Sequence, residues 1–258
     1  MIKSLLDRLI AASPAAWYLP NRVYRLRVIQ RAIDTLSART YLEIGVDDGA
    51  TFAALRVAKK IGVDPIEPRP AVTAALEHAG AEYFAATSDE FFEKHAAARF
   101  PSGVDVVFVD GLHTYQQTYR DVRNALNVLR PGGVILVHDC LPASAQEGVA
   151  APSYEEAFRI NGPEWNGDWT GDGWKAIVAV RSGHQQAQAC VLNCDHGVGI
   201  VWKGPRRPPL SLSLPEIDAL DYDALAAAPE ELIGLCRPAR LHRILRQLRK
   251  TPAARPSA

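Results

Sequence analysis

The sequence has no apolar run long enough to cross a membrane and no excess of charge of either sign. Its apolar runs, such as "VVFV" and "VILV", have the length of core strands and fall short of the roughly 18 residues that a membrane span needs. Twenty-nine basic residues balance twenty-nine acidic ones among 258 residues. The surface therefore has no net field to attract nucleic acid or an anionic membrane. We expect a globular protein without an integral membrane segment and without a nucleic-acid partner.

Cysteine is scarce as well: the chain has four, Cys140, Cys190, Cys194 and Cys236. They are too few and too scattered for a disulfide framework in a chain of this length. Cys190, Cys194 and His196 lack the second ligand pair of a zinc site, so we expect buried thiols there. Asp7 and Arg8 interrupt the N-terminal apolar period, which argues against a signal peptide and for a helix. The predicted location is the reducing cytoplasm.

Short apolar runs alternate with helix-like stretches between residues 40 and 140. The runs "TYLEIGV", "VDVVFVDG" and "VILVHDC" are apolar nearly throughout, which is typical of parallel strands covered by helices on both faces. We predict an α/β fold with a doubly wound, mostly parallel sheet. Residues 174–183 and 196–204 are predicted to be two further strands that pair as an antiparallel ribbon at the sheet edge.

Helical extensions are predicted on both sides of the sheet domain. The extensions occupy residues 1–37 and 205–258, and the domain occupies residues 38–204. In the second extension, "GPRRPPL" resembles a linker, and a basic amphipathic helix follows with an apolar stripe of Leu241, Ile244, Leu245 and Leu248. Docking of this stripe on the domain is the preferred interpretation. Peripheral contact with anionic lipids or with a partner is the alternative left open.

The first strand-to-helix junction is the expected ligand site, because ligands of doubly wound sheets bind beyond the carboxyl ends of the strands. Glu43 lies inside the strand, Gly45 at its end and Gly49 in the turn, where glycine lets a ligand approach the backbone. The spacing differs from the Gly-x-Gly-x-x-Gly fingerprint of dinucleotide sites. Asp47 repels a pyrophosphate and suits a cationic ligand. Asp64 ends the second strand, about where an acid hydrogen-bonds a ribose diol.

Four segments, "EIGVDDG", "GVDP", "VDVVFVDG" and "LRPGGVILVHD", occur in this order and resemble the motifs of class I S-adenosylmethionine-dependent methyltransferases. With "GDGWKAI" and "CDHGVGIV", the chain most resembles the methyltransferase type 24 family, and more distantly the metal-dependent sugar O-methyltransferases. The resemblance covers residues 38–204 and implies a seven-stranded sheet that ends in an antiparallel ribbon, a Rossmann-like methyltransferase fold.

The resemblance also implies which residues contact S-adenosyl-L-methionine. They are Glu43, Gly45 and Gly49 for the methionine part, Asp64 for the ribose, Ser88 and Asp89 for the adenine, and Asp110 at the same rim. Asp47 stands where the superfamily often has a glycine. Taken singly, these residues also have ordinary structural interpretations, since any turn can require a glycine and an aspartate before a proline can serve as a turn residue.

A second cluster is expected where the fourth and fifth strands end. Asp110 ends one strand and Asp139 the next, and neighbouring strands lie about 4.8 Å apart. Two carboxylates this close call for neutralisation, so the sequence predicts a site for Mg²⁺ or a similar divalent cation at Asp110 and Asp139. Adjacent strand residues face opposite sides, so Asp139 is the predicted ligand and His138 is expected to point into the interior.

His113, three residues past Asp110, is the predicted general base, with Asp110 as its catalytic neighbour. Transfer of a methyl group to a hydroxyl requires the oxygen to lose its proton, which a histidine accepts near neutrality and a cation facilitates. The sugar O-methyltransferases carry a similar Asp-x-x-His motif, but usually have a further acid where this chain has Cys140. The alternative left open is that Asp110 caps a helix and His113 binds a backbone carbonyl.

The loop "NGPEWNGDWTGDGWK" is the expected acceptor-binding segment, with Trp165 and Trp169 predicted to stack on a sugar face or ring. For Trp174, which is predicted to open a strand, packing is preferred. The sequence thus predicts a methyltransferase acting on a hydroxyl of a small molecule, with a sugar or glycosylated metabolite as the candidate acceptor. The sequence leaves open whether the chain forms a homo-oligomer. The alternatives are a non-catalytic cofactor-binding scaffold of the same fold and a nicotinamide-dependent oxidoreductase, which the missing fingerprint disfavours.

Overall fold

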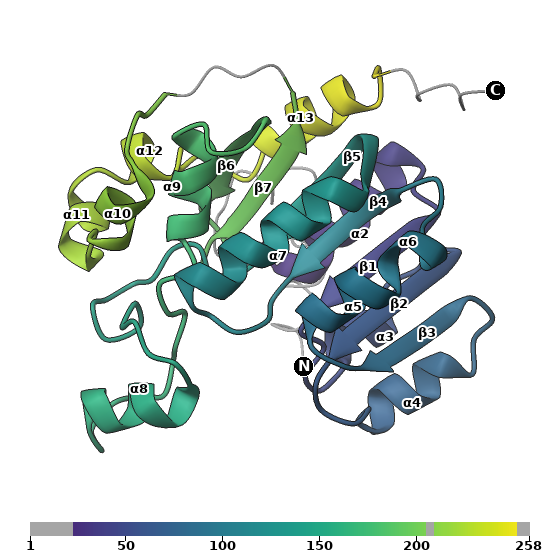
Figure 1. Ribbon diagram of the computed structural model, residues 1–258, viewed down its shortest axis with the longest axis horizontal. Coiled ribbons are helices and arrows are strands. Elements are labelled where there is room, and N and C mark those ends of the chain that lie inside the picture. Colours follow the sequence, from purple (N-terminus) through teal and green to yellow (C-terminus); the bar gives the residue numbers. More distant parts are fainter. Residues whose placement is uncertain (1–22, 205–208, 252–258) are drawn as a thin grey trace, which may run out of the picture.

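One mixed sheet of seven strands forms the centre of the protein, in the order β3-β2-β1-β4-β5-β7-β6 (Figure 1). The computed structural model describes residues 23–204 and 209–251. The strands are β1 (Thr40–Ile44), β2 (Lys59–Asp64), β3 (Ala81–Ala85), β4 (Val104–Val109), β5 (Leu129–Val137), β6 (Ala187–Leu192) and β7 (Val198–Lys203). The first five pair in parallel, and β7 runs antiparallel to both β5 and β6. The predicted fold class is confirmed.

Helices cover both faces of the sheet and enclose a separate apolar core on each. One face carries α2 (Arg25–Leu36), α3 (Ala50–Ala54), α4 (Pro70–Leu76) and α13 (Arg240–Leu248). The other carries α5 (Ser88–Lys94), α6 (Ala96–Arg99), α7 (Tyr115–Val128) and α9 (Lys175–Arg181). All six positions of β4 are buried, as expected for a central strand covered on both sides.

Residues 174–183, predicted to be a strand, form helix α9 instead. Every residue from Lys175 to Val180 is buried. Apart from Lys175 these buried residues are all apolar, so the sequence lacks the periodicity that distinguishes a helix from a strand. Trp174 precedes the helix and is buried, so the preference for packing agrees with the structure although the predicted strand is wrong. The ribbon consists of β6 and β7, and the thiols of Cys190 and Cys194 are buried as expected.

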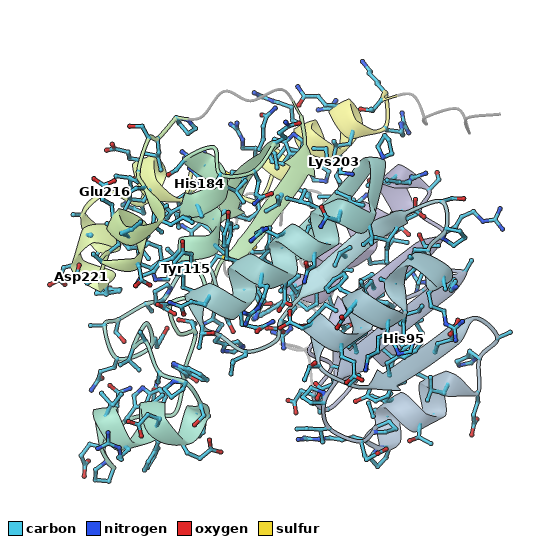
Figure 2. The ribbon with its side chains drawn as sticks, viewed as in Figure 1. His95, Tyr115, His184, Lys203, Glu216 and Asp221 are labelled. Atoms are coloured by element: carbon cyan, nitrogen blue, oxygen red, sulfur yellow. The ribbon has the colours of Figure 1, made fainter. Side chains whose placement is uncertain are left out.

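The extensions pack as short helices around the sheet domain. Residues 1–22 of the predicted N-terminal extension and 205–208 of the predicted linker lie outside the described residues, and α2 follows the first of these gaps. The second extension contains α10 (Leu214–Asp218), α11 (Tyr222–Ala227) and α12 (Pro229–Leu232), while α8 (Tyr154–Asn161) belongs to the sheet domain. Figure 2 shows Glu216 and Asp221 at the outer margin, where each takes part in capping the N-terminus of its helix.

Helix α13 docks its apolar stripe on the domain, against α2. The four stripe residues are buried, while basic side chains such as Arg243 point to the solvent. The preferred interpretation of the C-terminal segment agrees with this arrangement. Among residues 23–204 and 209–251, none of the helices combines the length and the apolar character that crossing a bilayer requires.

Replacing Leu245 tests whether α13 is part of the folded domain. Leu245 has 0% exposure, so Leu245→Ala is expected to lower the free energy of unfolding by about 2 to 5 kcal/mol, as for other buried leucines. Urea denaturation measures this loss. Arg243→Ala, on the exposed face of the same helix, is the matched control and should change stability by no more than about 0.5 kcal/mol. Equal small effects of both substitutions would show that α13 does not contribute to the core.

Candidate active site

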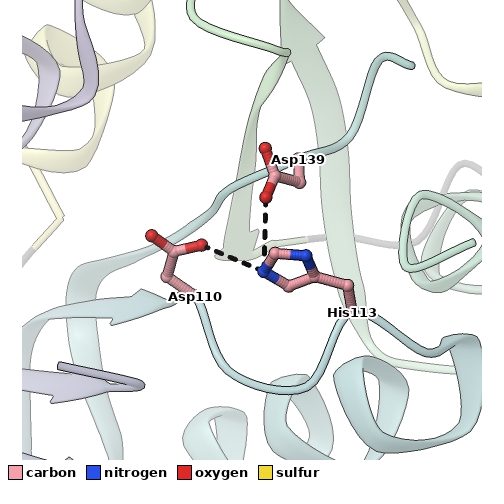
Figure 3. Close-up of side chains that lie close together, drawn as sticks. All are labelled: Asp110, His113 and Asp139. Carbon is pink, nitrogen blue, oxygen red and sulfur yellow. Dashed lines mark ion pairs between the residues drawn. The ribbon is translucent and has the colours of Figure 1, made fainter. Parts of the chain in front are cut away.

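The carboxyl ends of β4 and β5 bring Asp110 and Asp139 to one rim of the sheet (Figure 3). Asp110 follows β4 directly, and its backbone N–H donates to the carbonyl of Ile44 at 2.8 Å. Asp139 has a φ of 55°, a left-handed conformation that is uncommon for a residue other than glycine. Such conformations concentrate at functional sites. The sequence prediction that these two carboxylates converge is therefore reproduced by the structure.

His113 points its ring between the two carboxylates. Its Nε2 lies 3.3 Å from Asp139 Oδ2 and 3.7 Å from Asp110 Oδ1, and its Nδ1 lies 3.0 Å from the carbonyl oxygen of Trp169. A carbonyl only accepts hydrogen bonds, so Nδ1 carries a proton and the neutral ring has its lone pair on Nε2. Burial opposes protonation of the ring, but the two carboxylates outweigh it and raise the pKa of His113.

Of the two structural roles left open for this loop, the structure shows the carbonyl contact of His113 but no helix cap by Asp110. Thr114, not Asp110, is the N-cap residue of α7, and the N–H of Tyr115 donates to Asp172 Oδ1 at 2.7 Å. Asp110 is therefore free of a capping role. The expected bond from His113 to a backbone carbonyl does exist, but it uses Nδ1 only and leaves Nε2 directed at the carboxylates.

His138 belongs to the same cluster, which corrects the expectation that it points into the interior. Its Nδ1 lies 3.2 Å from Asp110 Oδ1 and 3.0 Å from Asp139 Oδ1, and its Nε2 lies 3.6 Å from Asp195 Oδ2. Burial alone would lower the pKa of His138, but Asp110 and Asp139 raise it well above its usual value. Conversely, Asp110 has a lowered pKa because the two imidazoles outweigh its burial. The ring of His138 thus bridges acids from three separate segments.

Arg25 and Asp195 complete the cluster and were missed by the sequence analysis. The backbone N–H of Arg25 donates to Asp195 Oδ2 at 2.6 Å, and its Nε lies 4.0 Å from Asp110 Oδ2. Asp195 and His196 both have positive φ in the turn between β6 and β7. The only signal in the sequence was this acid and histidine in a tight turn. Their contacts cross from the turn of the antiparallel ribbon to the start of α2, which no local pattern predicts.

Asp110, His113 and Asp139 are close enough to share one cation. One ligand atom from each lies within 4.8 Å of the other two, and no other group of this kind occurs in the described parts of the chain. An imidazole nitrogen and two carboxylate oxygens are common ligands of divalent metals. The two acids predicted as metal ligands are therefore together, with a histidine beside them.

Gly45 and Gly49 have clear structural reasons at the first loop. Both have a φ of 79°, and a Cβ on Gly45 would lie 2.1 Å from the backbone oxygen of Asp110. A Cβ on Gly49 would lie 2.3 Å from a methyl group of Val72. Gly45 therefore permits the ends of β1 and β4 to approach closely. Asp47, also at positive φ, is exposed and pairs with Arg69 at 3.0 Å.

Glu43 is buried in β1 with few polar partners. The hydroxyl of Tyr41 donates to Glu43 Oε2 at 2.6 Å. Burial raises the pKa of Glu43 to about 8, and the charge of Asp110 adds to this effect. Glu43 is therefore mostly protonated at neutral pH, although the charges of Lys60 and Arg25 lower its pKa.

Asp64, predicted to bind the ribose, also organises the first loop. Its Oδ2 accepts the N–H groups of Val46 at 2.9 Å and Asp47 at 3.1 Å, and its Oδ1 accepts that of Ile66 at 3.0 Å. The acid thus ties the end of β2 to the loop after β1. A ligand at this position would meet a carboxylate whose orientation is already set by three backbone bonds.

Ser88 and Asp89, predicted to lie near the adenine, begin α5. Ser88 Oγ donates to Asp121 Oδ1 at 2.6 Å, and Gln117 Nε2 donates to the same oxygen at 3.0 Å. Asp89 pairs with Arg120 at 3.2 Å on the surface. Burial raises the pKa of Asp121 to about 6. The burial of Asp121 was not predictable from the sequence, because a single acid inside an amphipathic helix resembles an exposed residue.

The tryptophan loop differs from the predicted stacking platform. Trp165 is buried beneath α8, where its ring contacts those of Tyr154 and Phe158. Trp169 is half-buried, its Nε1 donates to a backbone carbonyl, and its ring centre lies 5.3 Å from that of His113. Tyr154 and Phe158 are the exposed large rings of this segment. Packing therefore accounts for Trp165, while Trp169 remains beside the site.

Residues 42–140 match the model of a protein family described as a methyltransferase domain. The match includes part of β1, all of β2 to β5, and the three residues Asp110, His113 and Asp139. The match agrees, over these residues, with the sequence prediction of an S-adenosylmethionine-dependent methyltransferase domain. No curated protein matches the chain.

Solved structures resemble most of the chain. An O-methyltransferase from Bacillus cereus in complex with S-adenosylhomocysteine is 16% identical, with a TM-score of 0.52 over 79% of this chain and 100% of that one. A protein assigned as a caffeoyl-CoA O-methyltransferase from Staphylococcus aureus is also 16% identical, with a TM-score of 0.53 over 78% of this chain and 98% of that one. At these identities the likeness establishes the fold.

The pH dependence of stability tests the buried state of Asp121. Its folded pKa of about 6 lies above the usual aspartate value of 3.8, so the ionised carboxylate destabilises the folded state above pH 6. This penalty disappears as the pH falls through 6 towards 4, because the folded state then takes up a proton that the unfolded state does not. Asp121→Asn keeps an oxygen for Ser88 and Gln117 and should be more stable than the wild type at pH 8, by up to about 3 kcal/mol.

Urea denaturation of both proteins between pH 8 and pH 4 measures the effect. The advantage of Asp121→Asn should shrink as the pH falls, whereas Asp89→Asn on the surface should differ from the wild type by about 0.5 kcal/mol or less throughout. A constant difference between the variant and the wild type over this range would contradict a raised pKa of Asp121.

Proposed function

We propose that the protein transfers the methyl group of S-adenosylmethionine to a hydroxyl of a small molecule at the rim formed by β4 and β5. The observation that carries this proposal is the orientation of His113. Its Nδ1 is held by the Trp169 carbonyl, and its Nε2 faces Asp110 and Asp139. A cluster with an oriented imidazole and two carboxylates is suited to taking a proton from a hydroxyl.

The residues around the first loop fit a cationic nucleoside cofactor. Glu43 and Asp110 supply acidic groups near the close contact of β1 and β4, where a methionine ammonium and a sulfonium would be stabilised. Asp64 lies at the end of β2, and Ser88 and Asp121 lie at the start of α5. In this proposal Glu43 and Asp110 contact the methionine part of the cofactor and Asp64 contacts the ribose. Ser88 and Asp121 lie beside the adenine. When bound, the cofactor supplies an activated methyl group for in-line displacement by the acceptor oxygen.

The acidic cluster would prepare the acceptor for this displacement. The hydroxyl proton would leave toward the Asp110, His113 and Asp139 cluster, whose positions are set by the carbonyl of Trp169 and by His138. These fixed partners reduce the reorganisation that proton removal requires. A divalent cation bound at the same three residues would lower the pKa of the hydroxyl.

We propose that the acceptor enters from the side of the insertion between β5 and α9. This insertion contains α8 and reaches the cluster through Trp169, whose ring contacts both His113 and Tyr154. Tyr154 and Phe158 are exposed on α8, and exposed rings suit the face of a sugar or an aromatic group. A sugar or glycosylated metabolite thus remains the proposed acceptor.

The affinity for the cofactor should depend on the ionisation of Glu43. With a pKa of about 8, Glu43 is protonated below pH 8, and the ammonium of a bound ligand favours its ionised form. Binding of S-adenosylhomocysteine should therefore tighten as the pH rises from 6.5 to 8.5, by up to about tenfold per pH unit below the pKa. Calorimetry measures this slope. Glu43→Gln should flatten it, and Glu77→Gln, an exposed control, should not; an unchanged slope in Glu43→Gln would exclude this role for Glu43.

Variants of the cluster should separate methyl transfer from cofactor binding. We expect His113→Ala and Asp139→Asn to reduce methyl transfer at least about 100-fold, because they remove the groups that accept the proton. Binding of S-adenosylhomocysteine should persist, since neither residue lies among the predicted cofactor contacts. The readout is release of S-adenosylhomocysteine with a panel of sugars, glycosides and catechols. His78→Ala, an exposed histidine away from the cluster, is the matched control.

The same assay distinguishes the alternative of a non-catalytic scaffold. A protein that binds S-adenosylhomocysteine but methylates none of the panel would favour the scaffold. Full transfer by His113→Ala and Asp139→Asn would show that the proton leaves by another route. Binding of a nicotinamide dinucleotide in place of S-adenosylhomocysteine would favour the oxidoreductase alternative.

A further inference from the structure

We infer that Asp172 and Lys175 are positioning residues, which couple the second extension to the orientation of His113 through a buried ion pair. Both belong to the segment "GDGWKAI", which has no role in the proposed methyl transfer. The inference rests on the proposed function for its consequence in catalysis, because only that function makes His113 accept a proton. The coupling itself can be measured without an acceptor.

The segment from Trp169 to Asp172 holds both the ring and the backbone of His113. The carbonyl of Trp169 lies 3.0 Å from His113 Nδ1. The N–H of Asp172 donates to the carbonyl of His113 at 3.1 Å, and Asp172 Oδ1 accepts the N–H of Tyr115 at 2.7 Å. Gly171 permits this contact, since a Cβ there would lie 2.0 Å from the His113 carbonyl oxygen. The position of this segment therefore sets the direction of the imidazole.

Lys175 holds Asp172 from the other side. Its Nζ lies 3.1 Å from Asp172 Oδ2 and donates to the backbone carbonyl of Asp218 at 2.8 Å. The side chains of Lys175 and Asp172 are only 7% and 8% exposed. Asp172 thus divides its two carboxylate oxygens between the backbone of Tyr115 and the ammonium of Lys175.

Stability alone does not account for this ion pair. Removing two charges from water can cost more than their attraction returns, and apolar residues of similar volume often replace such pairs without loss of stability. Hydrogen bonds between charged groups are, however, short and directional. The pair therefore fixes where Asp172 lies, which apolar side chains would not do.

The carbonyl that accepts from Lys175 belongs to the second extension. Asp218 ends α10, which packs against α9 (Figure 1). Its Oδ1 accepts a hydrogen bond from Gln116 Nε2, in the first turn of α7, at 2.9 Å. The end of α10 is therefore joined to the start of α9 and to the start of α7. We call Asp218, Lys175 and Asp172 the relay.

Displacement of α10 would release the relay and then the loop that carries His113. The Nε2 of His113 would lose its fixed direction toward Asp110 and Asp139, and a misplacement of about 1 Å can cost about 100-fold in rate. None of the residues proposed to contact the cofactor belongs to the relay. Methyl transfer should therefore depend on the relay, whereas binding of S-adenosylhomocysteine should not.

Amide hydrogen exchange of the full chain without ligands, read by mass spectrometry, measures how often residues 111–118 open. Asp172→Ala should speed exchange in this segment at least about 10-fold, the effect of losing a hydrogen bond to a charged group. Asp172→Asn keeps an oxygen for the N–H of Tyr115 and should recover part of the protection. Asp223→Ala, at an exposed aspartate of α11, is the control and should resemble the wild type.

A matched pair of cavity variants tests the link to the second extension. Ile217 in α10 and Ile233 after α12 are both 0% exposed and belong to the same core. Ile217→Ala and Ile233→Ala remove the same group, so we expect comparable losses of stability, measured in urea. Only Ile217→Ala should speed exchange in residues 111–118. Ile217→Val and Ile233→Val are the milder pair if an alanine variant is unfolded in a thermal melt.

Steady-state kinetics separates positioning from a merely structural role. Asp172→Ala should lower kcat at least about 10-fold and leave the KM of the acceptor unchanged, as for an interaction that matters only in the transition state. Its affinity for S-adenosylhomocysteine, measured by calorimetry, should match that of the wild type. Asp172→Asn should recover part of kcat, in parallel with its protection from exchange.

Three results would overturn the inference. The first is exchange at the wild-type rate in residues 111–118 of folded Asp172→Ala, and the second is equal exchange there in the two isoleucine variants. The third is faster exchange with unchanged kcat, which would remove the role in catalysis. If the wild type methylates no acceptor, the proposed function fails, while the exchange measurements still decide whether the relay holds the His113 loop.

Discussion

The imidazole of His138 connects acidic groups that would otherwise repel one another. Asp110 and Asp139 end neighbouring parallel strands, and a third acid, Asp195, comes from the turn of the antiparallel ribbon. Like charges at such separations disfavour the folded state unless cations lie between them. His138 lies between these acids, and the guanidinium of Arg25 contacts both His138 and Asp110. The rim can therefore hold ionised carboxylates in fixed orientations, which is the condition for both proton removal and cation binding.

The second constraint is the close approach of β1 and β4. Only glycine fits at position 45, because a Cβ there would meet the backbone of Asp110. The same approach brings the loop after β1, held by Asp64, close to the acidic cluster. The residues proposed to bind the cofactor and the residues proposed to accept the proton thus lie at the same rim of the sheet. Their proximity follows from strand order, since β1, β4 and β5 are neighbours in the sheet.

Much of this architecture could be predicted because strands β1 to β5 carry a strong local signal. Asp110 and Asp139 were predicted to converge because parallel strands place their carboxyl ends together. The signal failed at α9, whose apolar residues are buried on all sides and show no period. It also failed for Asp195 and its partner Arg25, which lie 170 positions apart in the chain. Such contacts depend on how the ribbon and α2 pack on the sheet.

Side-chain exposure was the least predictable property of the site. Trp165 was expected at the surface from its polar neighbours in sequence, but α8 folds over it and leaves Tyr154 and Phe158 exposed instead. The error for Asp121 was the opposite one: its polar neighbours on α7 suggested a solvated helix face, but the side chain is buried. In both cases burial is decided by a segment that packs from elsewhere, which the local sequence does not encode.

The central claim is that the cofactor and the acidic cluster meet at the rim of β1, β4 and β5. A crystal structure of the protein with S-adenosylhomocysteine tests it most directly. The account predicts that the sulfur of the ligand lies beside Asp110 and faces His113, with the adenine beside Ser88 and Asp121. Binding of the ligand elsewhere, such as in the cavity that Cys190, Cys236 and Trp202 line at the edge of the ribbon, would contradict it.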